Sequence, residues 1–141
     1  MKQFKVSNTN SMYPTMKEND LVVIKKMANY IVGDILAYKN KNKQIGAHRL
    51  INIEEGYYLT KGDNNYKSEK TLKNKVVGKV IFINKQAIKT KLSDKIITQA
   101  SYFQTKIGCE TFERNKILRI MFKIITNPIL YLKNIKQIIL S

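Results

Sequence analysis

The sequence predicts a mainly β protein, with an antiparallel β-rich domain over residues 1–90 and a basic helical tail over residues 91–141. Up to about Lys89, short β-branched runs are separated by turn residues roughly every ten positions, which is typical of antiparallel barrels and sandwiches. Beyond Lys89, apolar residues recur at spacings of three and four, the period of an amphipathic helix. A chain of 141 residues has room for one domain with a proper core.

Five strands are expected along the first part of the chain. They lie in the segments 21–26, 32–40, 45–55, 57–65 and 76–85. Asn19-Asp20 bounds the first strand, a Gly33-Asp34 turn leads into the second, and the polar stretch "NKNKQ" forms a hairpin before the third. Alternation in the third strand puts Ala47, Arg49 and Ile51 on one face and His48 and Leu50 on the other.

Helices are expected from Ser93 onward. Ser93 is a good N-cap for a helix that Gly108 would end. Another helix should begin near Thr111 and end before Pro128, and Pro128 suits the first turn of a final helix. No acidic residue occurs from Arg114 to Ser141, so this tail is predicted to form one or two basic amphipathic helices.

The formal charge of +16 would usually suggest a nucleic acid or an anionic membrane as partner. However, 23 of the 26 basic residues are Lys, and Asn and Ile are also abundant, as an AT-rich genome would impose. The basic residues do not alternate with aromatic residues in a pattern that would favour base stacking. We therefore expect no specific nucleic acid partner.

Cys109 is the single cysteine, which excludes an intrachain disulfide and a cysteine-based metal site. We expect no metal and no cofactor. The N-terminal residues lack an apolar run of signal-peptide length, and no segment reaches the roughly 18 apolar residues of a membrane span. The expected location is the cytoplasm or the periphery of a membrane.

Ser11 and His48 are the residues that could carry chemistry. A serine hydroxyl is a poor nucleophile until a nearby base takes its proton, and His48 is the one histidine in the chain. Taken separately, each residue is unremarkable, because serine is common in turns and most single histidines are structural.

Four segments together favour a catalytic interpretation. In chain order they are "SMYPTM" (11–16), "GDILAY" (33–38), "AHRLI" (47–51) and "KGDNN" (61–65). This series resembles the signal peptidase I superfamily of serine proteases, which also contains the self-cleaving repressor proteases. The resemblance covers about residues 8–82 and implies the antiparallel β fold of that superfamily.

The third segment departs from the most common pattern. Bacterial-type signal peptidases and repressor proteases have a lysine base where this chain has His48. The segment is thus similar to the endoplasmic-reticulum, archaeal and sporulation-type branch, which implies that Ser11 attacks a peptide carbonyl while His48 accepts its proton. The exchange is chemically reasonable, since an imidazole titrates near neutral pH whereas a lysine must first be desolvated.

The resemblance also implies supporting residues. Asp63 is the first choice for the carboxylate that orients His48, and Glu69 is the alternative. Ser68 occupies about the place of a serine that lies beside the base in the bacterial type. The oxyanion hole would combine the backbone N–H of Ser11 with the hydroxyl of Thr9.

The predicted function is that of a serine endopeptidase of the signal peptidase I type. Its substrate would be a leader or signal-like peptide with small residues near the cleaved bond. Alternatives are a catalytically silent module that binds peptides or membranes, and a repressor-type self-cleaving protease. With ten residues before Ser11, we expect neither an N-terminal membrane anchor nor the DNA-binding domain of a repressor. Residues 114–141 could instead contact an anionic membrane, or pack on the β domain.

Overall fold

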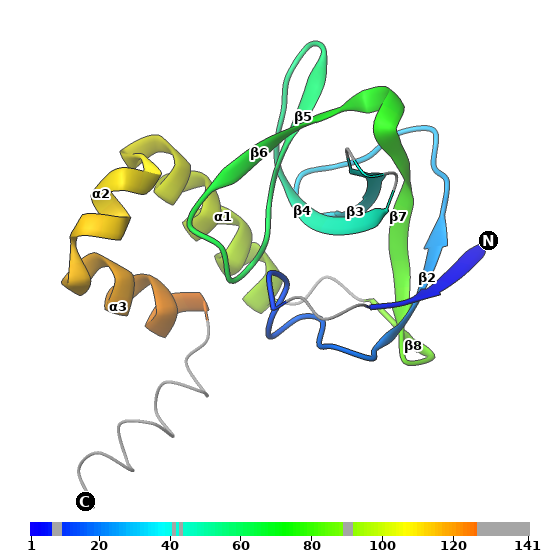
Figure 1. The fold of residues 1–141 in the computed structure, drawn as a ribbon, viewed down its shortest axis with the longest axis horizontal. Helices are drawn as coiled ribbons and strands as arrows, with labels where there is room; N and C mark the ends of the chain where they lie inside the picture. Colours follow the sequence, from blue (N-terminus) through cyan, green and yellow to red (C-terminus); the bar gives the residue numbers. More distant parts are fainter. Residues whose placement is uncertain (7–9, 41, 43, 89–91, 127–141) are drawn as a thin grey trace, which may run out of the picture.

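The structure is a computed structural model, and it describes residues 1–6, 10–40, 42, 44–88 and 92–126 (Figure 1). The strands are β1 (Lys2–Lys5), β2 (Leu21–Lys25), β3 (Ile35–Lys39), β4 (Ile45–Ile53), β5 (Tyr57–Lys61), β6 (Ser68–Leu72), β7 (Val76–Ile83) and β8 (Gln86–Ala87). The helices are a 3-10 turn η1 (Lys73–Lys75), α1 (Leu92–Ile107), α2 (Cys109–Arg114) and α3 (Lys116–Thr126). The predicted fold class, mainly antiparallel β with C-terminal helices, is confirmed.

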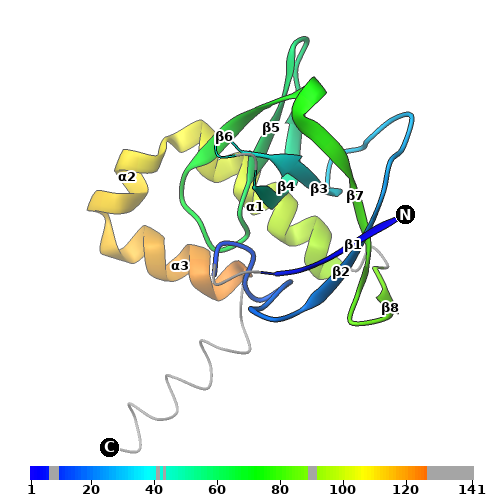
Figure 2. The same ribbon diagram turned by 45° about the vertical axis from the view of Figure 1, so that its right-hand side comes forward.

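The strands form one curved sheet in the order β1-β2-β7-β3-β4-β5-β6, with β8 added to β7. Each neighbouring pair is antiparallel. Strand β7 lies between β2 and β3, so a strand from later in the sequence joins two earlier strands that do not pair with each other. Figures 1 and 2 show α2 and α3 on the side opposite the N-terminus, while α1 extends along the sheet, where it contacts β4, and leads out to α2.

The five strands expected from the sequence correspond to β2, β3, β4, β5 and β7. The sequence did not predict β1, β6 or the short β8. Strands β1 and β6 are the two ends of the sheet order, and both consist largely of exposed polar residues. Such edge strands lack the apolar alternation that marks a half-buried strand, because only one side of each is paired.

The hydrophobic core lies between the central strands and the loop that follows β1. Buried side chains from three strands meet there, namely Val22 and Ile24 of β2, Ile35 and Ala37 of β3, and Val80 of β7. Met12 and Met16 insert into the same cluster from the loop before β2. Burial of two thioether side chains stabilises this loop by roughly 1.5–3 kcal/mol each and thereby fixes Ser11, the neighbour of Met12.

The helices follow the predicted pattern, with two differences. Helix α1 begins at Leu92, so Ser93 lies within its first turn and not before it. The second predicted helix is divided at Asn115, whose Oδ1 accepts hydrogen bonds from the backbone N–H groups of Ile117 at 3.0 Å and Leu118 at 3.2 Å. Asn115 is thus the N-cap of α3. Gly108, with φ of +94°, ends α1 as expected.

Residues 127–141, where the helix after Pro128 was predicted, lie outside the described residues. The strands occur before residue 88 and the α-helices from residue 92 onward. A division into a domain of residues 1–90 and a tail of residues 91–141 stays a prediction. In the described part of the chain, no helix is both long and apolar enough to cross a bilayer.

Candidate active site

The loop from Asn10 to Met16 presents Ser11 at the edge of the core. The loop is closed by two backbone hydrogen bonds, from Tyr13 N–H to the Asn10 carbonyl at 3.1 Å and from Met16 N–H to the Met12 carbonyl at 3.0 Å. Met12 and Met16 are 3% and 1% exposed, whereas Ser11 is half-buried. The two buried methionines therefore hold the backbone of the loop while the serine stays within reach of solvent.

The "KGDNN" loop after β5 packs directly against Ser11. The backbone N–H of Asn64 donates to the Ser11 carbonyl at 2.8 Å, and the side-chain amide of Asn64 donates to the Asn10 carbonyl at 3.2 Å. A Cβ atom on Gly62 would lie 2.6 Å from the Ser11 carbonyl oxygen. Glycine is needed at position 62 because the two backbones approach too closely for any side chain. The first and fourth sequence motifs thus meet in space.

His48 lies on β4 and shares a cavity with Ser11. The cavity has a volume of about 280 Å³. Besides these two residues, it is lined by Phe4, Lys5, Val6, Met12, Met16, Tyr38, Ile45, Gly46, Ala47, Asn65 and Glu69. The lining is part apolar and part polar, and Ser11, His48, Tyr38 and Glu69 are among the groups in it that could exchange protons during acyl transfer. The two predicted catalytic side chains are brought to one site.

The ring nitrogen Nδ1 of His48 has two neighbours. The hydroxyl of Tyr38 lies 3.0 Å from Nδ1, and Oε2 of Glu69 lies 3.5 Å from it. The Tyr38 hydroxyl also donates to Glu69 Oε2 at 3.3 Å. When that hydroxyl proton points at Glu69, the phenol oxygen can accept Nδ1–H, which leaves the lone pair on Nε2 as the basic site.

The environment lowers the pKa of His48 below its ordinary value of 6.5. Burial is the largest cause, since it penalises the charged imidazolium, and Lys61 adds to it. The carboxylates of Glu69 and, to a smaller extent, Asp63 oppose this effect by raising the pKa. His48 is therefore neutral at neutral pH, which is the form that can accept a proton.

Tyr38 is kept as a neutral phenol beside this histidine. Burial and the charge of Glu69 raise the pKa of Tyr38 well above its ordinary value. A phenol that keeps its proton can donate to Glu69 and accept from His48 at the same time. Tyr38 thus bridges the imidazole and the carboxylate.

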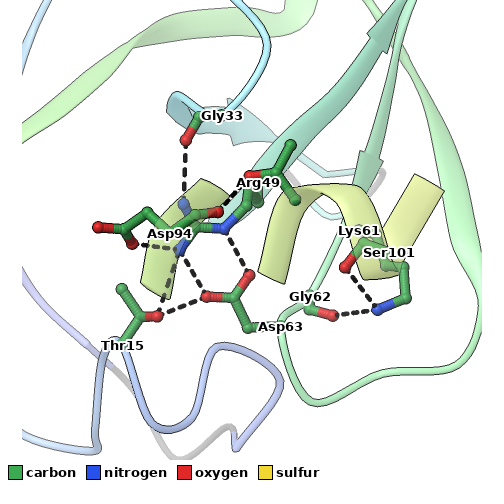
Figure 3. Close-up of polar contacts among 9 residues, drawn as sticks. Thr15, Gly33, Arg49, Lys61, Gly62, Asp63, Asp94 and Ser101 are labelled. Carbon is green, nitrogen blue, oxygen red and sulfur yellow. Dashed lines mark hydrogen bonds and ion pairs between the residues drawn. The ribbon is translucent and has the colours of Figure 1, made fainter. Parts of the chain in front are cut away.

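Asp63 is engaged by a different residue, Arg49, as Figure 3 shows. Nε and NH2 of Arg49 donate to the two carboxylate oxygens of Asp63 at 2.8 Å each. Thr15 Oγ1, four residues from Ser11, donates to Asp63 Oδ2 at 2.5 Å. Both partners of this two-point ion pair are almost fully buried. This geometry is the strongest that an arginine and a carboxylate can form.

Arg49 also joins the sheet to helix α1. Its NH1 donates to the Gly33 carbonyl at 3.0 Å, and NH2 lies 3.1 Å from Asp94 Oδ1 in the first turn of α1. Arg49 and Ile51 both lie against α1, as the alternation in β4 predicts. One side of β4 therefore carries the structural ion-pair network, while the neighbouring residue His48 belongs to the cavity with Ser11.

The structure thus separates the two carboxylates that the sequence left as alternatives. Glu69 lies at His48 Nδ1, and Asp63 is held by Arg49 and Thr15. Ser68 pairs with Lys61 across the β5–β6 ladder. Thr9, the expected oxyanion donor, lies outside the described residues.

Sequence reasoning did not single out Tyr38 as a site residue. In the β3–β4 hairpin, Tyr38 lies opposite Gly46 and Leu36 lies opposite His48. A Cβ on Gly46 would lie 3.0 Å from Tyr38 Cζ, so the tyrosine ring lies over the glycine and reaches diagonally toward His48. Tyr38 and Gly46 lie at equal distances from the polar turn, so the sequence did contain a signal that the tyrosine ring would cover the glycine across the hairpin.

Lys61 of the fourth motif is fully buried beside the helices. Its Nζ donates to the Gly62 carbonyl and to Ser101 Oγ on α1, each at 3.2 Å (Figure 3), and lies 4.7 Å from the ring centre of Phe122 on α3. Burial lowers the pKa of Lys61 to about 8, with Asp63 opposing the shift and Arg49 adding to it. Among the described residues, no group of His, Cys, Asp and Glu side chains is arranged to hold a metal ion.

Comparison with known proteins supports a peptidase fold. The family model described as peptidase S24-like matches residues 4–81. This range agrees closely with the segment, about residues 8–82, that carries the four motifs. The comparisons with curated proteins and with solved structures found no match. Because the family match spans more than half of the chain, the protein belongs to the peptidase S24-like family, which has the fold of a serine protease.

Proposed function

We propose that this protein is a serine endopeptidase of the signal-peptidase type that cleaves a leader or signal-like peptide. The observation that carries the proposal is the shared cavity of Ser11 and His48, in which Nδ1 of the histidine faces Tyr38 and Glu69. A nucleophile, a neutral base and a group that orients the base are the elements of acyl transfer by a serine protease.

In the proposed mechanism, Ser11 Oγ attacks the peptide carbonyl while Nε2 of His48 takes the hydroxyl proton. The carbonyl carbon passes through a tetrahedral intermediate, and the imidazolium then gives its proton to the leaving amine. Water enters in the second half of the cycle, His48 removes one of its protons, and the ester to Ser11 is hydrolysed. In the first half of the cycle the Ser11 proton leaves with the amine, and in the second half a water proton passes through His48 to Ser11 Oγ, so a full cycle restores both groups.

Glu69, acting through Tyr38, is the group that we assign to orient His48. It lies 3.5 Å from Nδ1 and accepts the Tyr38 hydroxyl at 3.3 Å, while both oxygens of Asp63 are bound by Arg49. Asp63 would contribute at a distance, through its negative charge and by holding Thr15 of the serine loop.

The oxyanion of the tetrahedral intermediate would be bound by the backbone N–H of Ser11 and by the hydroxyl of Thr9. One such donor typically stabilises the transition state by about 3 kcal/mol. This assignment is based on the family resemblance.

The proposed substrate is an extended peptide with small residues near the cleaved bond. The residues next to the cleaved bond would bind in the cavity that Ser11 and His48 share, and the preference for small side chains is based on the family resemblance. The choice of a leader or signal-like peptide is based on the family resemblance.

The decisive test compares wild type with Ser11→Ala and His48→Ala on a panel of fluorogenic leader-like peptides. Both variants should lose nearly all activity and by similar factors, because members of a catalytic unit act together. Thermal unfolding would verify that each variant is folded. Equal cleavage by wild type and Ser11→Ala would remove Ser11 from the mechanism.

Two further readouts separate the alternatives. A fluorophosphonate probe should label wild type at Ser11, whereas a silent binding module would remain unlabelled. A self-cleaving protease would cut its own chain at a rate independent of protein concentration and would leave added peptides intact. The proposal requires cleavage of a separate peptide, at a rate proportional to enzyme concentration.

A further inference from the structure

The exposed surface of α1 and α3 is apolar to a degree that is unusual for a helix facing solvent. Phe103 of α1 is 64% exposed, and Ile117 and Met121 of α3 are 69% and 52% exposed. Large exposed apolar patches on a soluble protein mark a surface that binds something. We name this surface the helical face.

The apolar residues of the helical face are contiguous. A groove of about 360 Å³ runs between the helices and is lined by Ile96, Gln99, Ala100, Phe103, Phe112, Leu118, Met121, Phe122 and Ile125. Its inner wall is formed by Phe112 and Phe122, which are buried and pack on each other with ring centres 5.8 Å apart. The outer residues Phe103, Met121 and Ile125 are left at the surface. The groove thus leads from the aromatic interior out to an apolar rim.

Basic residues form the polar side of α3. Lys116, Arg119 and Lys123 recur at spacings of three and four, so they lie together on the side of the helix opposite Met121 and Ile125. On α1, the exposed residues Lys95 and Lys106 stand near its two ends. No acidic residue occurs from Arg114 to Ser141. The partner of this surface must therefore combine an apolar phase with negative charge.

Charge argues against the two occupants that the chain itself could supply. The segment of residues 127–141 carries Lys133 and Lys136 and no acid, so its sequence offers no negative charge to the basic residues of α3. A second copy carries the same net charge of +16 and would be repelled.

We propose that the helical face binds the surface of an anionic lipid bilayer. Phe103, Ile117 and Met121 would enter the boundary between headgroups and acyl chains, while Lys116, Arg119 and Lys123 pair with lipid phosphates. This mode of binding requires no fixed polar partner in the groove, whose lining is almost wholly apolar. It is independent of the chemistry at Ser11, so Ser11→Ala should bind vesicles as wild type does.

The test is co-sedimentation of the full chain with phosphatidylcholine vesicles that contain or lack phosphatidylglycerol. Wild type should bind only the anionic vesicles, and added salt should weaken binding. Phe103→Ser and Ile117→Ser should each lower the partition coefficient by roughly tenfold. The matched control is Leu72→Ser, because Leu72 is an equally apolar residue, 53% exposed, at the distant end of β6.

A second pair of variants separates a local site from general charge. Lys116→Glu combined with Lys123→Glu should lower binding at least about 30-fold, since each basic residue at an anionic surface contributes about 1 kcal/mol. The control combines Lys39→Glu with Lys75→Glu, which are exposed residues of the β sheet region and give the same net charge. An equal loss in both double variants would overturn the proposal.

Two other results would also overturn it. The first is that wild type does not bind vesicles that contain phosphatidylglycerol. The second is that light scattering detects a dimer, which Ile117→Ser dissociates, while no binding to vesicles is detected. A lower Tm in Phe103→Ser, together with no vesicle binding by wild type, would indicate instead that another part of the chain covers the helical face.

Discussion

Arg49 binds both carboxylate oxygens of Asp63 at 2.8 Å, one residue along β4 from the proposed catalytic base His48. The two neighbours on this strand therefore serve different purposes. Arg49 ties the "KGDNN" loop and α1 to the sheet, while His48 lines the cavity that it shares with Ser11. We therefore expect a change at Asp63 to affect mainly the stability of the protein, and a change at Glu69 to affect mainly its activity.

Asp63→Asn should chiefly lower stability, and Glu69→Gln should chiefly lower activity. Breaking one side of a buried ion pair leaves a buried charge and costs about 3 kcal/mol, whereas the Glu69 side chain is 50% exposed and its loss should cost less than about 1 kcal/mol. Glu69→Gln should reduce kcat/KM by roughly 10- to 100-fold, because His48 loses its orienting group. Urea unfolding and peptide cleavage measure the two effects. The reverse pattern would assign the orienting role to Asp63.

The acid limb of the pH profile should lie below the ordinary histidine pKa of 6.5. Catalysis needs neutral His48, so activity is present above its pKa and falls as pH drops through it. Burial lowers that pKa, and Glu69 partly raises it again. Glu69→Gln should consequently move the limb to still lower pH while lowering the plateau. Measuring kcat/KM against pH for wild type and Glu69→Gln tests this direction, and an acid limb that moved to higher pH in the variant would contradict the prediction.

Gly46→Ala should disturb the active site through Tyr38. The added methyl would lie 3.0 Å from Tyr38 Cζ and 3.2 Å from its hydroxyl, so the ring must shift and its contact with His48 is disturbed. We expect kcat/KM to fall by about tenfold, similar to the effect of Tyr38→Phe. Gly56→Ala is the control, because no atom lies within 4 Å of a Cβ at that position.

The double variant Tyr38→Phe with Gly46→Ala tests whether the two changes share one cause. If Gly46→Ala acts by displacing the hydroxyl, the double variant should be little worse than either single variant. Additive losses would mean that the new methyl acts instead by narrowing the cavity. Unchanged activity in both single variants would remove Tyr38 from the mechanism.

Lys61→Met should change the pH dependence of stability. The pKa of Lys61 is about 8 in the folded protein and 10.5 in a model peptide, so the unfolded chain binds more protons between these values. Wild-type stability should rise with pH across that window, by up to about 3 kcal/mol from this group. Lys61→Met should be more stable than wild type below about pH 8 and lack this rise.

Urea unfolding at several pH values gives the comparison, with Lys75→Met as an exposed control. The control should follow the wild-type curve, since replacing a solvated lysine removes no desolvation cost. If the free energy of unfolding depended on pH in the same way in wild type and Lys61→Met, the prediction would be wrong, and the Lys61 amine would be solvated in the folded state.

The central strands were predictable from sequence because β2 and β7 are β-branched runs with buried residues, and because β3 is an apolar segment that follows the Gly33-Asp34 turn. The edge strands β1 and β6 were not, since "KQFK" and "SEKTL" are stabilised by pairing and not by burial of their own side chains. The interruption at Asn115 was missed because an asparagine inside a helical pattern carries no certain stop signal.

At the site, motif order was enough to predict that Ser11 and His48 would share a cavity, because both segments lie within the family's pattern. The choice between Asp63 and Glu69 depended on the register of β5 and β6 and on the position of Arg49, which are long-range features. Tyr38 reaches His48 through a diagonal contact across the β3–β4 hairpin. Such contacts follow from strand register, which a single sequence specifies only weakly.

The position of β7 between β2 and β3 has a consequence for synthesis. The segment with Ser11 leads into β2 and His48 follows β3, and among the described strands Val76–Ile83 is the one that pairs with both β2 and β3. During translation, Ser11 and His48 both leave the ribosome well before that strand does. The nascent chain therefore lacks the assembled cavity of Ser11 and His48 until the connecting strand has emerged.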